Sequence, residues 1–347
     1  MSRPVRALIV DDSASMRAAL RRILSADPEI EVVGMAPEPH AARAMMKELN
    51  PDVMTLDVEM PGMDGLSFLE KVMRLRPMPV VMCSTLTARG AEATIEALRL
   101  GAVDCIAKPT GNPLEIARDA ALLCATVKAA ARSSARGRQQ RPALVPPGPT
   151  ATRRDMVIAI GASTGGVEAL FGVIGALPTD CPPTLIVQHM PAAFTGGFAA
   201  RLQRESAVTV VEAVDGTRIA PGTVYIAPGG ETHMELRGGV NGYLKLSHGD
   251  LVAGHRPSVD VLFRSVADLG SSAVGVILTG MGSDGASGLL AMRRAGARTL
   301  GQSRESCVVY GMPKSAFEAG AVEREVSLSA MADAIMAACR KSPIASA

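Results

Sequence analysis

The sequence lacks the features that mark membrane, secreted or nucleic-acid-binding proteins. Its 36 basic and 34 acidic residues leave a formal net charge of +2, so there is no overall electrostatic case for a nucleic-acid partner or a membrane surface. No apolar run reaches the roughly eighteen residues of a membrane span, and a strand-like segment that begins at Val5 and runs into acids stands in place of a signal peptide. We therefore expect a cytoplasmic protein that neither inserts into membranes nor binds nucleic acid.

Cysteine is sparse, and the six cysteines are scattered rather than grouped. They have neither the spacing of a metal site nor that of a disulfide framework, and most of them stand among apolar residues. We interpret them as reduced thiols in the core of a cytosolic protein. They are Cys83, Cys105, Cys124, Cys181, Cys307 and Cys339.

The length of 347 residues predicts about two domains. In residues 1–125, short β-branched runs alternate with segments of helical periodicity, from Val5 to about Pro109. Strands and helices that alternate at this spacing predict five βα units and a parallel sheet covered on both faces. We therefore expect the first domain to have a (βα)5 fold.

The composition changes in residues 126–154. From Arg132 to Arg154 the segment is rich in Pro, Gly, Ser and Arg and has no periodicity, which predicts an exposed, flexible linker. We interpret its arginines as solvated. A second βα alternation fills residues 155–347 and ends in a helix near 330–340. There we predict a doubly wound, mostly parallel α/β domain.

Three aspartates end two strands of the first predicted domain. Asp11 and Asp12 follow the strand at 5–10, and Asp57 ends the strand "DVMTLD". The carboxyl ends of parallel strands open onto one crevice, so these carboxylates should converge, and Mg²⁺ is a hard cation that relieves their repulsion. A metal-neutralised aspartate can attack a phosphoryl group. The alternative is that Asp12 or Ser13 merely caps the next helix.

Two further strand ends supply groups that suit phosphoryl chemistry. Ser84 or Thr85 follows the strand "PVVMC", and Lys108 precedes Pro109. A lysine at this edge could pair with an acyl phosphate. Helix capping alone does not account for polar groups at four strand ends, so we favour a phosphoryl site.

The blocks "LIVDDS", "LDVEMPGMDGL", "MCST" and "AKPT", within about 3–123, resemble the signature of two-component response-regulator receiver domains. The resemblance implies that Asp57 accepts a phosphoryl group from a histidine kinase, that Ser84 is a switch hydroxyl and that Lys108 is the lysine of the site. The Mg²⁺ ligands that it implies are Asp11, Asp12, Asp57 and the main-chain carbonyl of Glu59. The chain departs from the family pattern at Cys105, where receivers usually place an aromatic switch residue.

The segment "MVIAIGASTGGVEAL" (156–170) runs from an apolar strand through a tight turn of small residues into helix formers. Its "GASTG" fits the nucleophile-elbow pattern G-x-S-x-G, with the required strand before it and helix after it. It does not fit the dinucleotide fingerprint, because Ser163 replaces the second glycine. The next strand ends in Gln188 and His189 rather than in the acid that a ribose needs. We therefore predict a nucleophilic serine.

A nucleophilic serine needs a base, and the base needs an orienting acid. His189 ends the strand next to that of Ser163, and Asp284 lies in the glycine-rich turn "MGSDGASG" after a third strand. The order Ser, His, Asp differs from the Ser, Asp, His order of α/β-hydrolases. Backbone nitrogens from Thr164 onward, with a donor near Met281, can form an oxyanion site. Each residue also has a structural alternative: Ser163 could cap a helix, His189 could bond a carbonyl and Asp284 could be an ordinary acid in a turn.

The segment "HRPSVDVLF" is chiefly a core-facing helix, because Val259, Leu262 and Phe263 recur at helical spacing. His255 and Arg256 precede this helix. Polar loop residues serve function more often than core residues do. These two residues are therefore candidates for substrate contacts at the border of the site.

The blocks "IGASTGG", "QHMP", "YIAPGG", "HRPSVDVLF" and "TGMGSDGASG" resemble the catalytic domain of chemotaxis protein-glutamate methylesterases of the CheB type. The resemblance implies a triad of Ser163, His189 and Asp284, and an oxyanion site made by the main chain at Thr164 and Met281. It implies methyl-esterified glutamates on chemoreceptor helices as substrates, and deamidation of glutamines at similar sites. We therefore predict a serine hydrolase regulated by phosphorylation of its own receiver domain, with no cofactor for ester hydrolysis.

Two other functions are compatible with a receiver domain. The C-terminal half could be a non-catalytic module that binds a partner, which the complete triad pattern disfavours. It could instead bind DNA, but it shows no basic recognition helix and no helix-turn-helix pattern. We therefore keep the hydrolase as our prediction.

Overall fold

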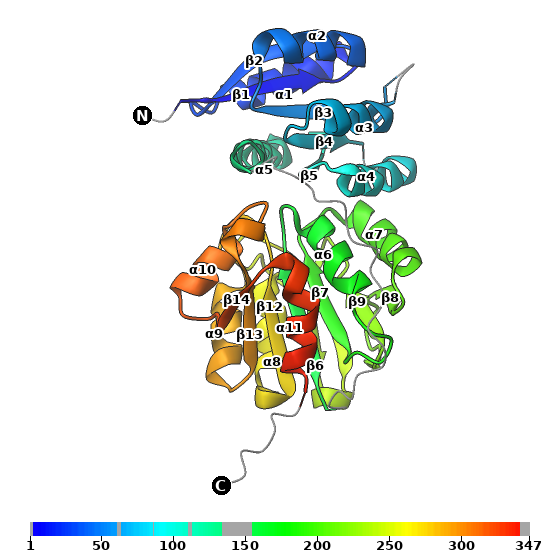
Figure 1. Ribbon diagram of the computed structural model, residues 1–347, viewed down its shortest axis with the longest axis vertical. Helices are drawn as coiled ribbons and strands as arrows, with labels where there is room; N and C mark the ends of the chain where they lie inside the picture. The colour runs from blue at the N-terminus through cyan, green and yellow to red at the C-terminus, as the bar shows by residue number, and fades with distance from the viewer. Residues whose placement is uncertain (1–2, 61–63, 86, 110–112, 134–154, 341–347) are drawn as a thin grey trace. The chain divides into compact units, whose positions relative to one another are not determined.

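The chain folds into two compact units, residues 1–140 and 141–347, and Figure 1 labels most of their helices and strands. The computed structural model describes residues 3–60, 64–85, 87–109, 113–133 and 155–340. Within these ranges, every helix is too short or too polar to cross a membrane.

The first unit is a parallel five-stranded sheet in the order β2-β1-β3-β4-β5. β3 and β4 are buried along their whole length, as expected when helices cover both faces of a parallel sheet. The predicted (βα)5 fold is confirmed. The strands are β1 (Val5–Val10), β2 (Ile30–Ala36), β3 (Val53–Asp57), β4 (Val80–Ser84) and β5 (Asp104–Ala107), and the helices are α1 (Ala14–Ser25), α2 (Pro39–Leu49), α3 (Gly65–Leu75), α4 (Ala88–Leu100) and α5 (Pro113–Arg132).

The helix α5 contains residues 126–132, with which the predicted linker begins. Leu123, Val127 and Ala130 are buried and recur at helical spacing, so this stretch continues the helix that packs against the sheet. The first residues of the predicted linker are therefore helical, as far as Arg132. The remainder of the predicted linker, 134–154, lies outside the described residues.

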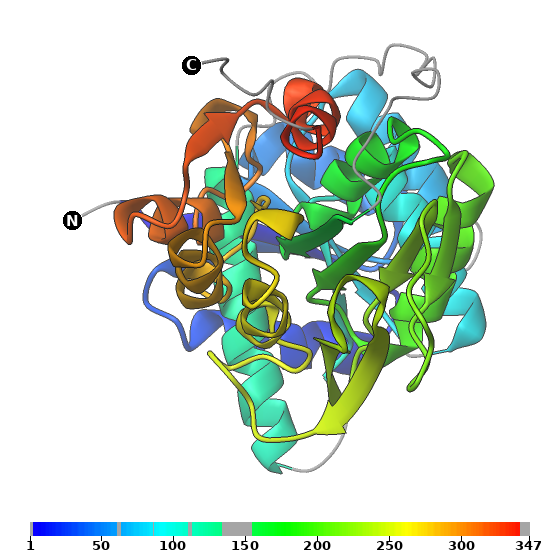
Figure 2. The same cartoon turned by 90° about the horizontal axis from the view of Figure 1, so that it is seen from below.

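The second unit is a seven-stranded sheet in the order β14-β13-β12-β6-β7-β9-β8, and all of its strand pairs are parallel. Figure 2 shows α8 and α9 on one side of this sheet and α6 and α11 on the other. The predicted doubly wound α/β architecture is confirmed. The strands are β6 (Val157–Ala162), β7 (Thr184–Gln188), β8 (Thr209–Glu212), β9 (Thr223–Ile226), β12 (Ala273–Ile277), β13 (Arg298–Gln302) and β14 (Arg324–Val326).

The helices of the second unit complete both layers, and a separate antiparallel hairpin stands outside the sheet. The helices are α6 (Gly166–Gly175), α7 (Ala192–Glu205), α8 (Val259–Ala267), α9 (Ala286–Arg294), α10 (Met312–Glu318) and α11 (Met331–Ala338), and the hairpin strands are β10 (Thr232–Arg237) and β11 (Tyr243–His248).

The centre of the second sheet is formed by β6, β7 and β12, all of whose residues are buried. Gly161 in β6 lets α8 approach, because a Cβ at this position would lie 2.2 Å from Val259 Cγ1. Since Val259 is the first residue of α8, this contact holds the N-terminus of that helix against the carboxyl end of the central strand.

Candidate active site

The strand ends of the first unit bring three carboxylates together. Asp11 and Asp57 are buried and Asp12 is exposed, and ligand oxygens of the three lie within 4.8 Å of one another. Ser13 does cap α1, since its hydroxyl accepts a hydrogen bond from Met16 N, but this cap leaves the three carboxylates grouped. Oxygen donors of this kind are what Mg²⁺ prefers, so the cluster fits that cation.

Lys108 offsets part of the charge of this cluster. Its Nζ lies 2.8 Å from Asp11 Oδ2 and 2.8 Å from Asp57 Oδ2. Burial lowers the pKa of Lys108, but its hydrogen bonds to both aspartates outweigh burial and raise that pKa above the ordinary value. Burial raises the pKa of Asp57, although Lys108 opposes this. The lysine is therefore a cation beside the aspartate that the sequence predicts as phosphoacceptor.

The other predicted receiver residues surround this cluster. The buried Ser84 ends β4, and its hydroxyl donates to the carbonyl of Thr85 over 3.1 Å. Glu59 N donates to Asp57 Oδ1 over 3.2 Å, and Thr85 Oγ1 donates to Glu59 Oε2 over 3.4 Å. On β5, burial raises the pKa of the Cys105 thiol. This strand position therefore presents a small protonated thiol in place of an aromatic ring.

In the second unit, Ser163 stands between the end of β6 and the start of α6. Its N–H donates to Thr279 O over 3.0 Å. Its carbonyl accepts from Gly166 N over 2.7 Å and from Gln188 Nε2 over 3.0 Å. The N-cap of α6 is Gly165, at φ 76°, and no side chain caps this helix. The alternative of a serine helix cap is therefore wrong, and the hydroxyl remains for other chemistry.

His189 directly follows β7, the strand next to β6. Ala162 pairs with Gln188 in the sheet. His189 N also donates to Ala162 O over 3.0 Å, which places Ser163 and His189 at the same sheet edge. His189 Nε2 lies 2.9 Å from Asp284 Oδ2, whereas the buried Nδ1 has no hydrogen-bond partner among the described residues. Donation of the Nε2 proton to the carboxylate leaves a lone pair on Nδ1, as a general base requires.

Asp284 is buried in the turn before α9, and donors surround its carboxylate. Oδ1 accepts from Ser258 Oγ over 2.8 Å and from Asp260 N over 3.0 Å. Oδ2 accepts from Val259 N over 2.8 Å in addition to His189. These donors lie at the N-terminus of α8, where the helix dipole favours an anion. Burial raises the pKa of Asp284, but His189 and the α8 donors lower it by more, so it lies below its ordinary value.

His255 borders His189, as the sequence suggests for the loop before α8. The two rings are stacked, with centroids 3.7 Å apart and planes 7° from parallel. Burial and the neighbouring His189 lower the pKa of His255 to about 4, although Asp284 opposes this. A neutral ring therefore covers one face of His189. Arg256, the other candidate, donates to two loop carbonyls instead.

The turn after β12 lies against the serine. A Cβ on Gly280 would be 2.7 Å from Ser163 Cβ, closer than such atoms approach, so this position needs glycine. Met281 comes next in this turn, and Thr164 comes next after Ser163; both are predicted oxyanion donors. In the described part of the chain, neither of their main-chain nitrogens donates a hydrogen bond to another group. Both N–H groups therefore remain available to a developing oxyanion.

Three residues to which the sequence analysis assigned no role in catalysis hold this site together. Gln188 Nε2 donates to the carbonyls of Ser163 and His189, each over 3.0 Å. Ser258 donates to Asp284, and His233 accepts a hydrogen bond from Ser258 N at its Nδ1. In the sequence, Gln188 is visible only as a polar residue at a strand end, and Ser258 only as a serine before a helix. Neither pattern indicates which group the side chain contacts.

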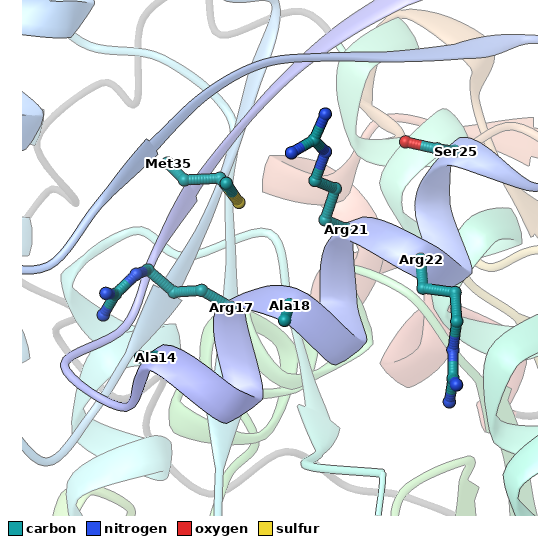
Figure 3. Close-up of a pocket in the computed structure, with 7 residues that line it drawn as sticks. All are labelled: Ala14, Arg17, Ala18, Arg21, Arg22, Ser25 and Met35. Atoms are coloured by element: carbon teal, nitrogen blue, oxygen red, sulfur yellow. The ribbon is translucent and has the colours of Figure 1, made fainter.

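A separate hollow lies along α1 of the first unit (Figure 3). Arg17, at one end of it, donates to the carbonyls of Asp11 and Asp12. Its lining holds no carboxylate, histidine or cysteine for acid–base or nucleophilic chemistry, so we place no reaction there. The hollow has a volume of about 450 Å³ and is lined by Ala14, Arg17, Ala18, Arg21, Arg22, Ser25 and Met35.

Comparisons with known proteins agree for both units. The family model for the CheB methylesterase matches residues 158–335, and the model for the response regulator receiver domain matches residues 7–118. A protein-glutamate methylesterase/protein-glutamine glutaminase 1 of Caulobacter vibrioides is 57% identical over 341 residues, covering 96% of this chain and 97% of the relative. One of the same name from Rhizobium johnstonii is 55% identical over 346 residues, covering 98% of this chain and 99% of the relative.

Among solved structures, the chain is similar to the CheB methylesterase catalytic domain of Thermotoga maritima. The TM-score is 0.51 and the sequence identity is 37%. The similarity covers 52% of this chain and 97% of that domain.

The low pKa of His255 predicts a pH dependence of stability. Because the folded chain resists protonation of this ring, the unfolded chain binds the proton more readily, and stability is lost as the pH falls from about 6.5 towards about 4. At 1.36 kcal/mol per unit of pKa, the loss in free energy of unfolding is about 3 kcal/mol.

Denaturant unfolding at several pH values tests this. His255→Phe, which keeps a ring but cannot titrate, should flatten the dependence, whereas His248→Gln at an exposed strand end should leave it unchanged. An equally steep dependence in His255→Phe would assign the titration to another group.

Proposed function

This chain belongs to the CheB methylesterase family, with a response-regulator receiver domain at its N-terminal side, and on that premise we propose the role of each site residue. The chain is a phosphorylation-regulated protein-glutamate methylesterase and protein-glutamine glutaminase of chemotaxis adaptation. We propose that it removes methyl esters from glutamates on chemoreceptor helices. The observation that supports the proposed residues best is the buried Nδ1 of His189, which has no hydrogen-bond partner in the described part of the chain, while Asp284 holds Nε2.

The first half-reaction forms an acyl-enzyme. Ser163 Oγ attacks the carbonyl carbon of the glutamyl ester while its proton passes to His189 Nδ1. The main-chain N–H groups of Thr164 and Met281 donate to the resulting oxyanion. The tetrahedral intermediate then expels the methoxy group, which takes the proton from Nδ1 and leaves as methanol.

The second half-reaction restores the enzyme. A water molecule gives a proton to His189 Nδ1 and attacks the acyl carbonyl, and Ser163 Oγ then leaves with that proton. Throughout, Asp284 holds the Nε2 proton and stabilises the imidazolium that forms in each half-reaction. Deamidation of glutamine follows the same steps with ammonia as the leaving group, so one site serves both substrates.

For the receiver, we propose that Asp57 is the phosphoacceptor and that a histidine kinase supplies the phosphoryl group. Mg²⁺ would be held by Asp11, Asp12, Asp57 and the Glu59 carbonyl, and would neutralise charge on the phosphoryl group. Lys108, already paired with Asp57 Oδ2, stays beside the modified residue, and Ser84 supplies the switch hydroxyl.

We also propose that the receiver ends with α5, that residues 133–154 form the linker and that the catalytic domain begins at 155. A cytoplasmic location accords with six cysteines that form no disulfide, all of them buried except the half-buried Cys307. Ester hydrolysis itself is proposed to need no cofactor.

Replacing Ser163 with Ala should abolish ester hydrolysis, with a loss of at least about 10³-fold by analogy with other triads. The fold should survive, because the side chain caps no helix. Methanol release from methylated receptor fragments measures the activity, and circular dichroism checks the fold. Ser206→Ala is the matched control, because this hydroxyl donates to the carbonyls of Leu202 in α7 and of Val208 just beyond it. Near-normal turnover by Ser163→Ala would place the nucleophile elsewhere.

Phosphorylation of Asp57 should raise the activity of the full chain by about 5- to 150-fold, the range of typical coupling energies. Methanol release with acetyl phosphate and Mg²⁺ should increase for the wild type but not for Asp57→Ala. A chelator should remove the increase without lowering the basal rate. Asp27→Ala, which removes a carboxylate paired with Lys128, should respond like the wild type. Full stimulation of Asp57→Ala would exclude Asp57 as phosphoacceptor.

A further inference from the structure

The hydrogen-bond donors around Asp284 divide into two kinds. Val259 N and Asp260 N are main-chain groups that any sequence would supply at the start of a helix. Among the described residues, Ser258 Oγ and His189 Nε2 are the two side-chain donors. Ser258 is therefore the side chain, other than the proposed base itself, that touches the carboxylate, and it does so at Oδ1, on the oxygen that faces away from His189.

Ser258 is itself held in place from its other side. Its main-chain N–H donates to His233 Nδ1 over 3.1 Å, and His233 Nε2 lies 2.9 Å from Asp250 O. Because a carbonyl can only accept, Nε2 carries the proton and Nδ1 is the acceptor. His233 and Ser258 are both buried. A continuous chain of hydrogen bonds thus runs from the β11–α8 loop through His233, Ser258 and Asp284 to His189.

The helix does not need the serine hydroxyl in order to be capped. Asp284 caps the N-terminus of α8 through the main-chain N–H groups of Val259 and Asp260. In return, Asp260 Oδ1 accepts from Gly288 N in the first turn of α9 over 2.6 Å. Since main-chain donors make this reciprocal cap of two packed helices, loss of the Ser258 hydroxyl leaves the cap in place.

We propose that Ser258 is a positioning residue of the hydrolase, which fixes the rotation of the Asp284 carboxylate and limits the negative charge that Oδ2 presents to His189. This proposal rests on the proposed function of Ser163, His189 and Asp284. A donor on Oδ1 holds the carboxylate plane so that Oδ2 points at Nε2. It also draws charge towards Oδ1, and a carboxylate that loses such a donor becomes more basic.

Two consequences distinguish this role from a purely structural one. Without the hydroxyl, Oδ1 keeps Asp260 N as a donor but loses the shorter bond from Ser258. The carboxylate is then held less firmly and orients His189 less well, so kcat falls while substrate contacts and KM change little. A more basic carboxylate also stabilises the imidazolium more, so half-maximal activity moves to higher pH. The other ionisable groups that face Asp284 are His189 after β7, His255 before α8, and Asp260 on α8 with its partner Arg264, and they are unchanged in the test variants.

The test compares Ser258→Ala with the wild type in the full chain, by methanol release from methylated receptor fragments over a range of pH. We expect kcat to fall by about 10- to 100-fold, as for a lost hydrogen bond to a charged group, and the half-maximal pH to rise by roughly 0.5. Ser258→Thr, which keeps a hydroxyl, should restore both values. Ser265→Ala is the matched control, because its hydroxyl lies on the same helix but bonds Leu236 N and Leu262 O.

The outcomes separate the two proposals. An unchanged kcat and pH profile in a folded Ser258→Ala, alongside an inactive Ser163→Ala, would overturn the role of Ser258 alone. Equal loss in Ser258→Ala and Ser265→Ala, in step with lost stability, would also overturn it. Full activity of Ser163→Ala would overturn the triad and this proposal with it. Should Ser258→Ala fail to fold, Ser258→Cys takes its place, since a thiol fills similar space but donates weakly.

Discussion

The buried carboxylate of Asp284 is the group on which the rest of the second unit's site depends. An isolated carboxylate at this depth would cost several kcal/mol to desolvate, and the N-terminus of α8 offsets that cost with two main-chain donors and a serine hydroxyl. The resulting anion fixes which nitrogen of His189 carries the proton. The close approach of α8 to β6 at Gly161 is therefore a condition for the electrostatics of the site, not only for packing.

In both units, the carboxyl ends of parallel strands bring carboxylates together, but different groups compensate the negative charge in each. Parallel strands bring polar groups to one edge, where they must be paired or hydrogen-bonded. In the first unit, Lys108 places a full positive charge between Asp11 and Asp57, which suits a site that must accept further negative charge. In the second unit, fixed dipoles surround Asp284, and they would need no rearrangement if His189 takes up a proton as we propose.

Local patterns were sufficient to predict both sheets and the strand ends that carry the polar residues. The pairings of those residues across the site were beyond such patterns. Ser258 contacts Asp284 only because α8 packs on α9. In the local sequence, the segment before α8 has only the pattern of an ordinary helix start. Gln188 entered the prediction only because it stands where a dinucleotide-binding domain would have an acid. The helical character of residues 126–132 was missed because the buried Val127 and Ala130 carry less compositional signal than the prolines and glycines that follow.

The strand order of the second sheet has a consequence for when the site can exist. β6, which precedes Ser163, pairs on one side with β12, whose Ala273 meets Val157 from far along the chain. Such non-local pairings carry a large loop-closure cost and form late in folding. A chain that is still being synthesised holds the serine and the histidine long before the α8 and α9 segments that supply Asp284 and its donors. On the proposed triad, the nascent polypeptide should therefore remain inert as an esterase until the α8 and α9 segments have been synthesised and have packed on the sheet.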